Sequence, residues 1–144
     1  ADKQDWPLGP RVIGACYTWK TGTTIEEFDI VFNSQHFTWG TQGESGRMDI
    51  GHIATHEVGH YLNLRHIWGD GRCNRDDFVS DTPISDAPNY GCPSYPTVNC
   101  RSTDMTMNYM DYTYDACMYM YSEGQKTRMR AVFASGGPRA SMLP

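Results

Sequence analysis

The stretch His56-Glu57-Val58-Gly59-His60-Tyr61-Leu62-Asn63-Leu64-Arg65-His66 organises the whole chain. Two histidines four positions apart on a helix project from one face about 5 to 6 Å apart, which suits two ligands of one small cation. Glu57 lies between them, where its carboxylate can reach a water on the metal without ligating the metal. This spacing is typical of a zinc hydrolase with a glutamate as general base.

His66 follows His60 by six positions, a separation that a straight helix cannot place on one face because a turn takes 3.6 residues. The helix is therefore expected to end between them. Asn63 suits this end, since asparagine readily enters the left-handed conformation of a helix C-terminus. Three neutral imidazoles and a water then form a tetrahedral site with one open position, the pattern of catalytic zinc.

Two other sets of metal ligands are possible. His52 stands four positions before His56, but only His56 and His60 enclose a glutamate, so we prefer the latter pair. A set with a downstream glutamate as third ligand would have to use Glu123, which starts a later helix far along the chain. His66 is therefore the predicted third ligand.

Size and charge limit the class of protein. The 144 residues, of 16.3 kDa, predict a single domain over 1–144, with an upper subdomain at 1–66 and a lower one at 67–144. The net charge of -5 argues against a nucleic-acid partner. No apolar run approaches the roughly 18 residues of a membrane span. Because the chain also starts at Ala1 without a leader, we expect a mature or excised soluble segment.

The five cysteines include no CxxC pair, which favours disulfides in an oxidising compartment and hence a secreted protein. Four follow the histidine stretch, and sequence alone allows three pairings of Cys73, Cys92, Cys100 and Cys117. Cys16 is left over. We interpret it as a buried thiol in a strand, ahead of an inhibitory thiol that binds the metal.

The hydrophobic pattern predicts an α+β fold. Strands are expected over 11–19 and 28–39, and a helix is expected from an N-cap at Asp49 to about Leu64. Residues 69–103 are expected to form a long loop that the cysteines order. Ser122 and Gln125 form a capping box for a last helix, which glycines 136 and 137 are expected to end.

The histidine stretch resembles the metzincin signature HExxHxxGxxH, with Asn63 where most members carry glycine. Within the metzincins, residues 47–143 resemble the pappalysin family, particularly its bacterial cytophagalysin branch. The resemblance rests on motifs in the family's order: Ile67-Trp68-Gly69-Asp70, Asp77-Phe78-Val79-Ser80-Asp81-Thr82-Pro83, Asn108-Tyr109-Met110-Asp111-Tyr112, and Gly124-Gln125 leading to Arg128-Met129.

This resemblance implies a metzincin-like catalytic domain with a zinc-binding helix, a loop-rich lower subdomain stapled by disulfides, and a C-terminal helix. It implies a methionine turn beneath the metal at Met110 and a tyrosine that approaches the zinc at Tyr112. It pairs Cys73 with Cys100 and Cys92 with Cys117. It also implies a Ca²⁺ site, formed by Asp77, Val79, Asp81 and Thr82, whose hard oxygen ligands suit that ion.

Alternatives stay open at several of these positions. Met110 can also be interpreted as one of eight methionines in a core, Tyr112 as a core tyrosine, and the acidic segment as a solvated loop. Only 55 residues precede His56, fewer than in most metzincins. The upper sheet is therefore expected to be truncated, or to be completed by a missing segment, a propeptide or an oligomeric partner.

The leading functional hypothesis is a secreted Zn²⁺-dependent endopeptidase that acts on protein or peptide substrates. Glu57 is its general base, and Tyr112 supports the oxyanion. A zinc-containing peptide-binding module without activity is the alternative from another class, and a disulfide-stapled domain without metal is the third. Glu57 favours the enzyme, because a site that only binds has no use for a base.

Overall fold

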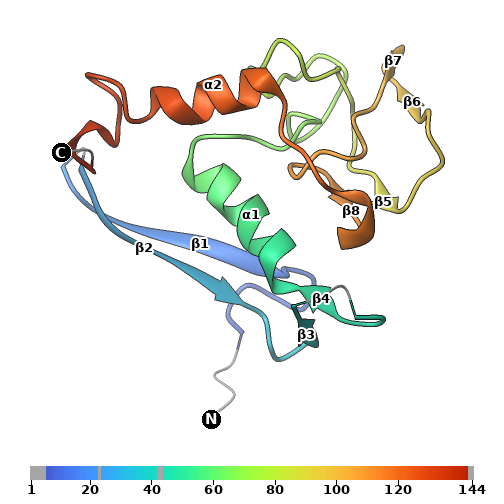
Figure 1. Ribbon diagram of the computed structural model, residues 1–144, viewed down its shortest axis with the longest axis horizontal. Coiled ribbons are helices and arrows are strands. Elements are labelled where there is room, and N and C mark those ends of the chain that lie inside the picture. Colours follow the sequence, from blue (N-terminus) through green and yellow to red (C-terminus); the bar gives the residue numbers. More distant parts are fainter. Residues whose placement is uncertain (1–5, 23, 42–43, 143–144) are drawn as a thin grey trace.

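The computed structural model describes residues 6–22, 24–41 and 44–142. Two helices dominate it, α1 (Ile50–Tyr61) and α2 (Glu123–Ala131). The longest strands are β1 (Gly14–Thr21) and β2 (Thr24–Phe32), which form an antiparallel hairpin. In Figure 1, α1 runs between this hairpin and α2. No helix among the described residues is long and apolar enough to cross a membrane.

The hairpin packs one face on α1. Its register pairs Gly14 with Phe32 and Cys16 with Ile30, with an irregularity between Trp19 and Lys20. Alternate residues of a strand share a face, and Phe28, Ile30 and Phe32 on one face of β2 are less exposed than Asp29 and Val31 on the other. Phe28 stacks on Tyr61 of α1, with ring centroids 4.0 Å apart. The hairpin therefore supports the histidine helix from behind.

The second strand ends earlier than the predicted range 28–39, and Asn33 explains why. Its side chain is fully buried, donates through Nδ2 to the Val12 carbonyl (2.8 Å) and accepts from the His36 backbone N–H (3.1 Å). These bonds turn the chain out of the hairpin. A separate strand, β3 (Trp39–Gly40), then pairs in parallel with β4 (Met48–Asp49), directly before α1.

Helix α1 begins as predicted and ends sooner. Asp49 is the N-cap, and its carboxylate accepts from the His52 backbone N–H (3.1 Å). Asn63 adopts the left-handed conformation predicted for the helix end (φ 71°), and α1 stops at Tyr61, three residues before the expected limit near Leu64. The N–H of Leu64 then bonds to the Gly59 carbonyl (2.9 Å), which closes the helix end and turns the chain back.

Disulfides and short strand pairs order the segment after α1. The structure joins Cys73 to Cys100 and Cys92 to Cys117, the same pairing that the resemblance implied. Two pairs of short strands lie here: β5 (Tyr90–Gly91) is parallel to β8 (Tyr112–Thr113), and β6 (Val98–Asn99) is antiparallel to β7 (Ser102–Thr103). One 3-10 turn, η1 (Asp115–Cys117), follows β8. Cys16, by contrast, is a free, half-buried thiol in β1.

Helix α2 holds the segment that contains Met110. The predicted capping box of Ser122 and Gln125 is confirmed, although the helix ends at Ala131, several residues before the glycines expected to stop it. Gln125 and Asn108 are fully buried and exchange two side-chain hydrogen bonds, of 2.7 and 3.0 Å. Asn108 also accepts from the Met110 N–H (2.9 Å). The cap of α2 thus fixes the turn at Met110.

The C-terminal part of the chain packs against Tyr61, the last residue of α1. In Figure 1 it returns to the far end of the β1–β2 hairpin. There the guanidinium of Arg139 lies 4.2 Å from the centre of the Tyr61 ring, and the Tyr61 hydroxyl reaches Met142 Sδ (3.0 Å) in η2 (Ala140–Met142). Tyr61 is therefore covered by Phe28 and Arg139 together.

Gly59 offers a test of this packing. A Cβ at position 59 would lie 2.5 Å from Met110 Sδ and 2.9 Å from the Tyr121 hydroxyl, and Met110 is fully buried. Gly59→Ala should therefore lower the free energy of unfolding by about 1 to 3 kcal/mol, measured by urea denaturation. Gly51→Ala, in the exposed first turn of α1, is the control: a Cβ there would meet only the side-chain oxygen of Asp49, at 3.1 Å, so the variant should cost less than Gly59→Ala. Equal losses in both variants would contradict the close approach of Met110.

Candidate metal centre

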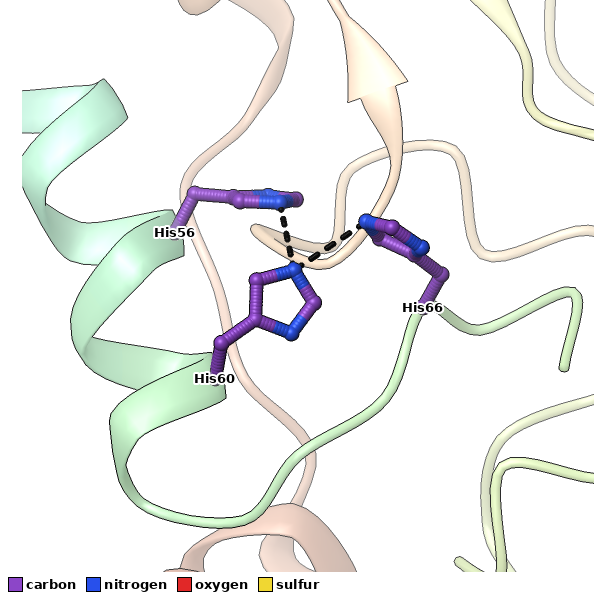
Figure 2. Close-up of side chains that lie close together, drawn as sticks. All are labelled: His56, His60 and His66. Atoms are coloured by element: carbon purple, nitrogen blue, oxygen red, sulfur yellow. Dashed lines mark hydrogen bonds between the residues drawn. The ribbon is translucent and has the colours of Figure 1, made fainter. Parts of the chain in front are cut away.

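Three histidine side chains converge at one point. The Nε2 atom of His60 lies 3.0 Å from that of His56 and 3.1 Å from that of His66. Figure 2 shows that the first two rings project from α1, while the third comes from the segment after the helix end. The left-handed residue Asn63 begins the return that brings His66 back to the helix. The structure thus brings together the three predicted ligands.

The opposite ring nitrogens set the tautomers. The Nδ1 atom of His56 lies 2.6 Å from the Tyr109 carbonyl oxygen, and that of His60 lies 3.1 Å from the Leu64 carbonyl oxygen. A carbonyl only accepts, so each Nδ1 carries the proton. His66 Nδ1 likewise lies 2.6 Å from a carboxylate oxygen of Asp70. Three Nε2 lone pairs therefore face one another.

Burial keeps the imidazoles of His56 and His60 neutral. It lowers the pKa of His56 to about 3, with His60 as the next cause, because a second positive charge so close is unfavourable. Burial also lowers the pKa of His60, and His66 adds to the effect. Neutral imidazole is the form that binds a metal ion.

The donor set fits zinc. The ligand nitrogens of a tetrahedral zinc site lie about 3.3 Å apart, given Zn–N bonds of about 2.0 to 2.1 Å. The two observed separations of 3.0 and 3.1 Å come close to this value. Lone pairs that face one another repel unless a cation lies between them. Three nitrogen donors leave a fourth position open, as in catalytic zinc sites.

Glu57 and Tyr112 lie beside the histidines in one cavity of about 980 Å³, which His56 also lines. The cavity has walls from both predicted subdomains, with Gly14 and Ile53 on one side and Thr113 on the other. Strand β1 runs close to Glu57, since a Cβ on Gly14 would lie 3.4 Å from its Oε1. Burial raises the pKa of Glu57, whereas the backbone N–H of Cys16 lowers it.

The Tyr112 ring packs among the histidines. Its centroid lies 4.9 Å from that of His66, 5.6 Å from that of His56 and 4.9 Å from that of Trp68. Burial, and then the Glu57 charge, raise the pKa of its phenol to about 12. Tyr112 therefore keeps its proton at neutral pH and can donate a hydrogen bond into the cavity.

The predicted calcium residues come together only in part. The Thr82 hydroxyl lies within 2.9 Å of both Asp77 carboxylate oxygens and 2.7 Å from the Val79 carbonyl oxygen. Burial raises the pKa of Asp77 to about 6. The hydrogen bonds of the Asp81 carboxylate go elsewhere: it accepts from the Ser122 hydroxyl (2.7 Å) and the Gly124 N–H (2.9 Å) of the α2 cap.

Sequence reasoning missed two partners of the histidines, Asp70 and Trp68. Asp70 binds His66 Nδ1, and Trp68 stacks on the same ring at 4.2 Å with an angle of 5° between the planes. Gly69 and Asp70 both have positive φ, so the chain turns tightly here. An acidic residue four positions after His66, next to a glycine that permits such a turn, was the available signal.

Comparisons with known proteins agree with this geometry. The sequence model of the peptidase M43 family, described as pregnancy-associated plasma protein-A, matches residues 14–134. An extracellular metalloprotease of Sordaria macrospora is 35% identical over 135 residues, which cover 90% of this chain and 47% of the relative. An extracellular metalloprotease of Neurospora crassa is 33% identical over the same length, with the same coverage.

Solved structures match as well. Mature mirolysin of Tannerella forsythia in complex with a cleaved peptide is 48% identical, with a TM-score of 0.68 over 78% of this chain and 44% of that one. A promirolysin variant of the same organism is 47% identical, with a TM-score of 0.67, 78% coverage of this chain and 39% of its own. The chain spans about half the length of the curated relatives it matches.

Asp70 supplies a test of how the third histidine is held. Asp70→Asn removes the charge that accepts from His66 Nδ1, so zinc affinity should fall about 10- to 100-fold, measured by competition with a chelating dye. His66→Ala should fail to retain zinc after dialysis. His52→Ala removes a histidine outside the cluster and should leave affinity unchanged. Full zinc occupancy in His66→Ala would rule out the three-histidine site.

Proposed function

Because the chain belongs to the peptidase M43 family, the pappalysin metallopeptidases, we propose that it is a zinc-dependent endopeptidase. The observation that supports this most is the convergence of three Nε2 atoms, 3.0 and 3.1 Å apart, beside a cavity that contains Glu57. His56, His60 and His66 hold the metal in this proposal. The cavity between residues 1–66 and 67–144 is the substrate cleft of one catalytic domain.

Zinc bound at the three histidines supplies Lewis-acid chemistry, which polarises a carbonyl group and makes water a better nucleophile. Glu57 takes a proton from the attacking water and passes it to the leaving amine. The raised pKa of Glu57 suits both steps, since a stronger base accepts the proton more readily. Tyr112, whose phenol stays protonated, donates a hydrogen bond to the developing oxyanion.

We infer that Met110 forms an apolar support beneath this centre. It is fully buried in a cluster with Leu64, Ile67 and Trp68, and its carbonyl accepts from the Ile67 N–H (3.3 Å). This contact joins the turn that leads to Tyr112 to the segment that carries His66. We assign Met110 to the methionine turn of the family on this basis.

The substrate of this enzyme is a polypeptide outside the cell. A cleaved peptide occupies the related mirolysin, and the relatives of Sordaria and Neurospora are named extracellular metalloproteases. Two disulfides suit an oxidising compartment. The existence of a promirolysin supports a propeptide as a partner of this chain too. The β1–β2 hairpin is the place to look for it, because these two strands pair only with each other among the described residues.

Glu57 separates hydrolysis from binding. Glu57→Ala removes the base and keeps all three imidazoles, so zinc content should persist while turnover of an unstructured protein falls at least about 10²- to 10⁴-fold. Glu123→Ala, on the exposed first turn of α2, is a matched control and should keep full turnover. A peptide-binding module without activity would show no chelator-sensitive hydrolysis in the unchanged protein, and normal turnover in Glu57→Ala would remove this residue from the mechanism.

We also propose a Ca²⁺ ion at Asp77, Thr82 and the Val79 carbonyl. Four oxygens gather there around one hydroxyl proton, an arrangement that a hard cation would stabilise. For Asp81 the calcium role stays a prediction, because both its carboxylate oxygens accept hydrogen bonds from the α2 cap.

Calcium should raise the melting temperature, by about 5 °C or more at 100-fold excess over its Kd. The pKa of Asp77 is raised to about 6, so the folded state binds the Asp77 proton more tightly than the unfolded state does. Protonation of Asp77 therefore stabilises the fold at low pH, and this contribution is lost as the pH rises through about 6. Calcium needs the ionised carboxylate. The rise in melting temperature on adding calcium should therefore be present at pH 7.5 and vanish near pH 5. It should be absent in Asp77→Asn and unchanged in the control, Asp86→Asn. An equal shift in Asp77→Asn would contradict the site.

A further inference from the structure

Residues 89–92, here called the strap, run beside the segment that carries Tyr112. In the parallel pair of β5 and β8, Tyr90 lies opposite Tyr112 and Gly91 opposite Thr113. The N–H of Tyr114 donates to the Gly91 carbonyl (2.7 Å). The strap ends at Cys92, which is bonded to Cys117. The chain after Tyr112 is therefore joined to the strap by this hydrogen bond and by the disulfide.

Asn89, the first residue of the strap, is hydrogen-bonded to Asp111, the residue before Tyr112. Asn89 donates twice to the Asp111 carboxylate, from its backbone N–H to Oδ1 (2.9 Å) and from Nδ2 to Oδ2 (3.0 Å). The Tyr112 N–H donates to the same Oδ1 (2.8 Å). Asp111 is only 1% exposed. If one of its donors is removed, the cost of desolvating this carboxylate is no longer offset by that hydrogen bond, and the local structure is destabilised.

The Tyr112 phenol has no hydrogen bond to any of the residues described in the structure. Its place depends on ring contacts with His66, His56 and Trp68 and on the backbone from which the side chain extends. Asp111 is the preceding residue, and its carboxylate is the point where Asn89 and the Tyr112 N–H meet. A shift of Asp111 would thus move the Tyr112 side chain directly.

We propose that Asn89 is a positioning residue for catalysis: its two hydrogen bonds to Asp111 hold the backbone that presents Tyr112 to the substrate. This role rests on the proposed function, because it matters only if the phenol acts on a bound substrate. Asn89 does not touch the reacting atoms. It lies 22 positions before Asp111 and acts on Tyr112 through that carboxylate.

Asn99 provides a matched control within the same polar network. The Nδ2 atom of Asn89 also reaches Oδ2 of Asp104 (3.1 Å), and Asn99 Nδ2 donates to that same oxygen. Asp104, like Asp111, is only 1% exposed. Loss of Asn99 therefore also removes a donor from a buried carboxylate. Its side-chain hydrogen bond goes to Asp104, which is not adjacent to Tyr112.

The test compares kcat, KM, zinc content and melting temperature for the zinc-loaded protein and its variants. Asn89→Ala keeps the backbone N–H bond to Asp111 and removes the bond from Nδ2. It should lower kcat about 10-fold or more, because small misplacement of a reacting group is costly, and should leave KM and zinc content nearly unchanged. Asn99→Ala should melt earlier and keep its kcat. In a Tyr112→Phe background, Asn89→Ala should lower kcat no further, since the phenol it positions is gone.

Asp111→Asn is the second variant, in case Asn89→Ala fails to fold. It keeps the side-chain volume and the Oδ1 acceptor, but places an amide where Oδ2 accepted from Asn89. It should also lower kcat without adding to Tyr112→Phe. Additive losses, or an equal kcat loss in Asn99→Ala, would overturn the positioning role alone. A protein without metal-dependent hydrolysis, or a Tyr112→Phe variant with normal kcat, would overturn the proposed roles of the site and this inference together.

Discussion

Three imidazole lone pairs that face one another are the constraint on which the structure depends. Each Nε2 is left unprotonated because the other ring nitrogen donates elsewhere, to the carbonyls of Tyr109 and Leu64 or to the Asp70 carboxylate. These acceptors come from three different segments. The metal centre therefore requires that the helix end, the turn after His66 and the segment before Met110 are all in place.

The rest of the fold supplies that placement. The helix ends at Tyr61, and the left-handed Asn63 starts the return to His66. The turn at Met110 packs on Gly59 from the other side and is itself held by Asn108, which pairs with Gln125 of α2. A helix cap far along the chain thus determines where the Tyr109 carbonyl meets His56.

Local patterns predicted the features that depend on a few neighbouring residues. The N-cap at Asp49, the left-handed end at Asn63 and the capping box at Ser122 were of this kind. The convergence of His56, His60 and His66 also followed from spacing, because only a break in the helix can bring the third ring to the first two. Family resemblance added the disulfide pairing, which spacing left open among three choices.

What sequence reasoning missed depends on contacts between distant segments. Asn33 ends the hairpin through the Val12 carbonyl, so the continuous strand predicted over 28–39 breaks. Asp81 caps α2 across 41 positions, and Arg139 covers Tyr61 from the C-terminal part. A polar side chain can form hydrogen bonds with many different groups, and its actual partner depends on which distant segment the fold brings next to it. Asp81 is an example: it was predicted to bind calcium, but its carboxylate accepts hydrogen bonds from the α2 cap.

X-ray absorption at the zinc edge, recorded on protein loaded with one equivalent of zinc, tests the central claim most directly. Three imidazoles and one oxygen ligand predict a first shell of nitrogen and oxygen scatterers at about 2.0 to 2.1 Å, with the outer-shell features of histidine rings. A sulfur scatterer at about 2.3 Å would instead place a cysteine, such as Cys16, on the metal. That result, or a shell without three imidazoles, would contradict the account of this site.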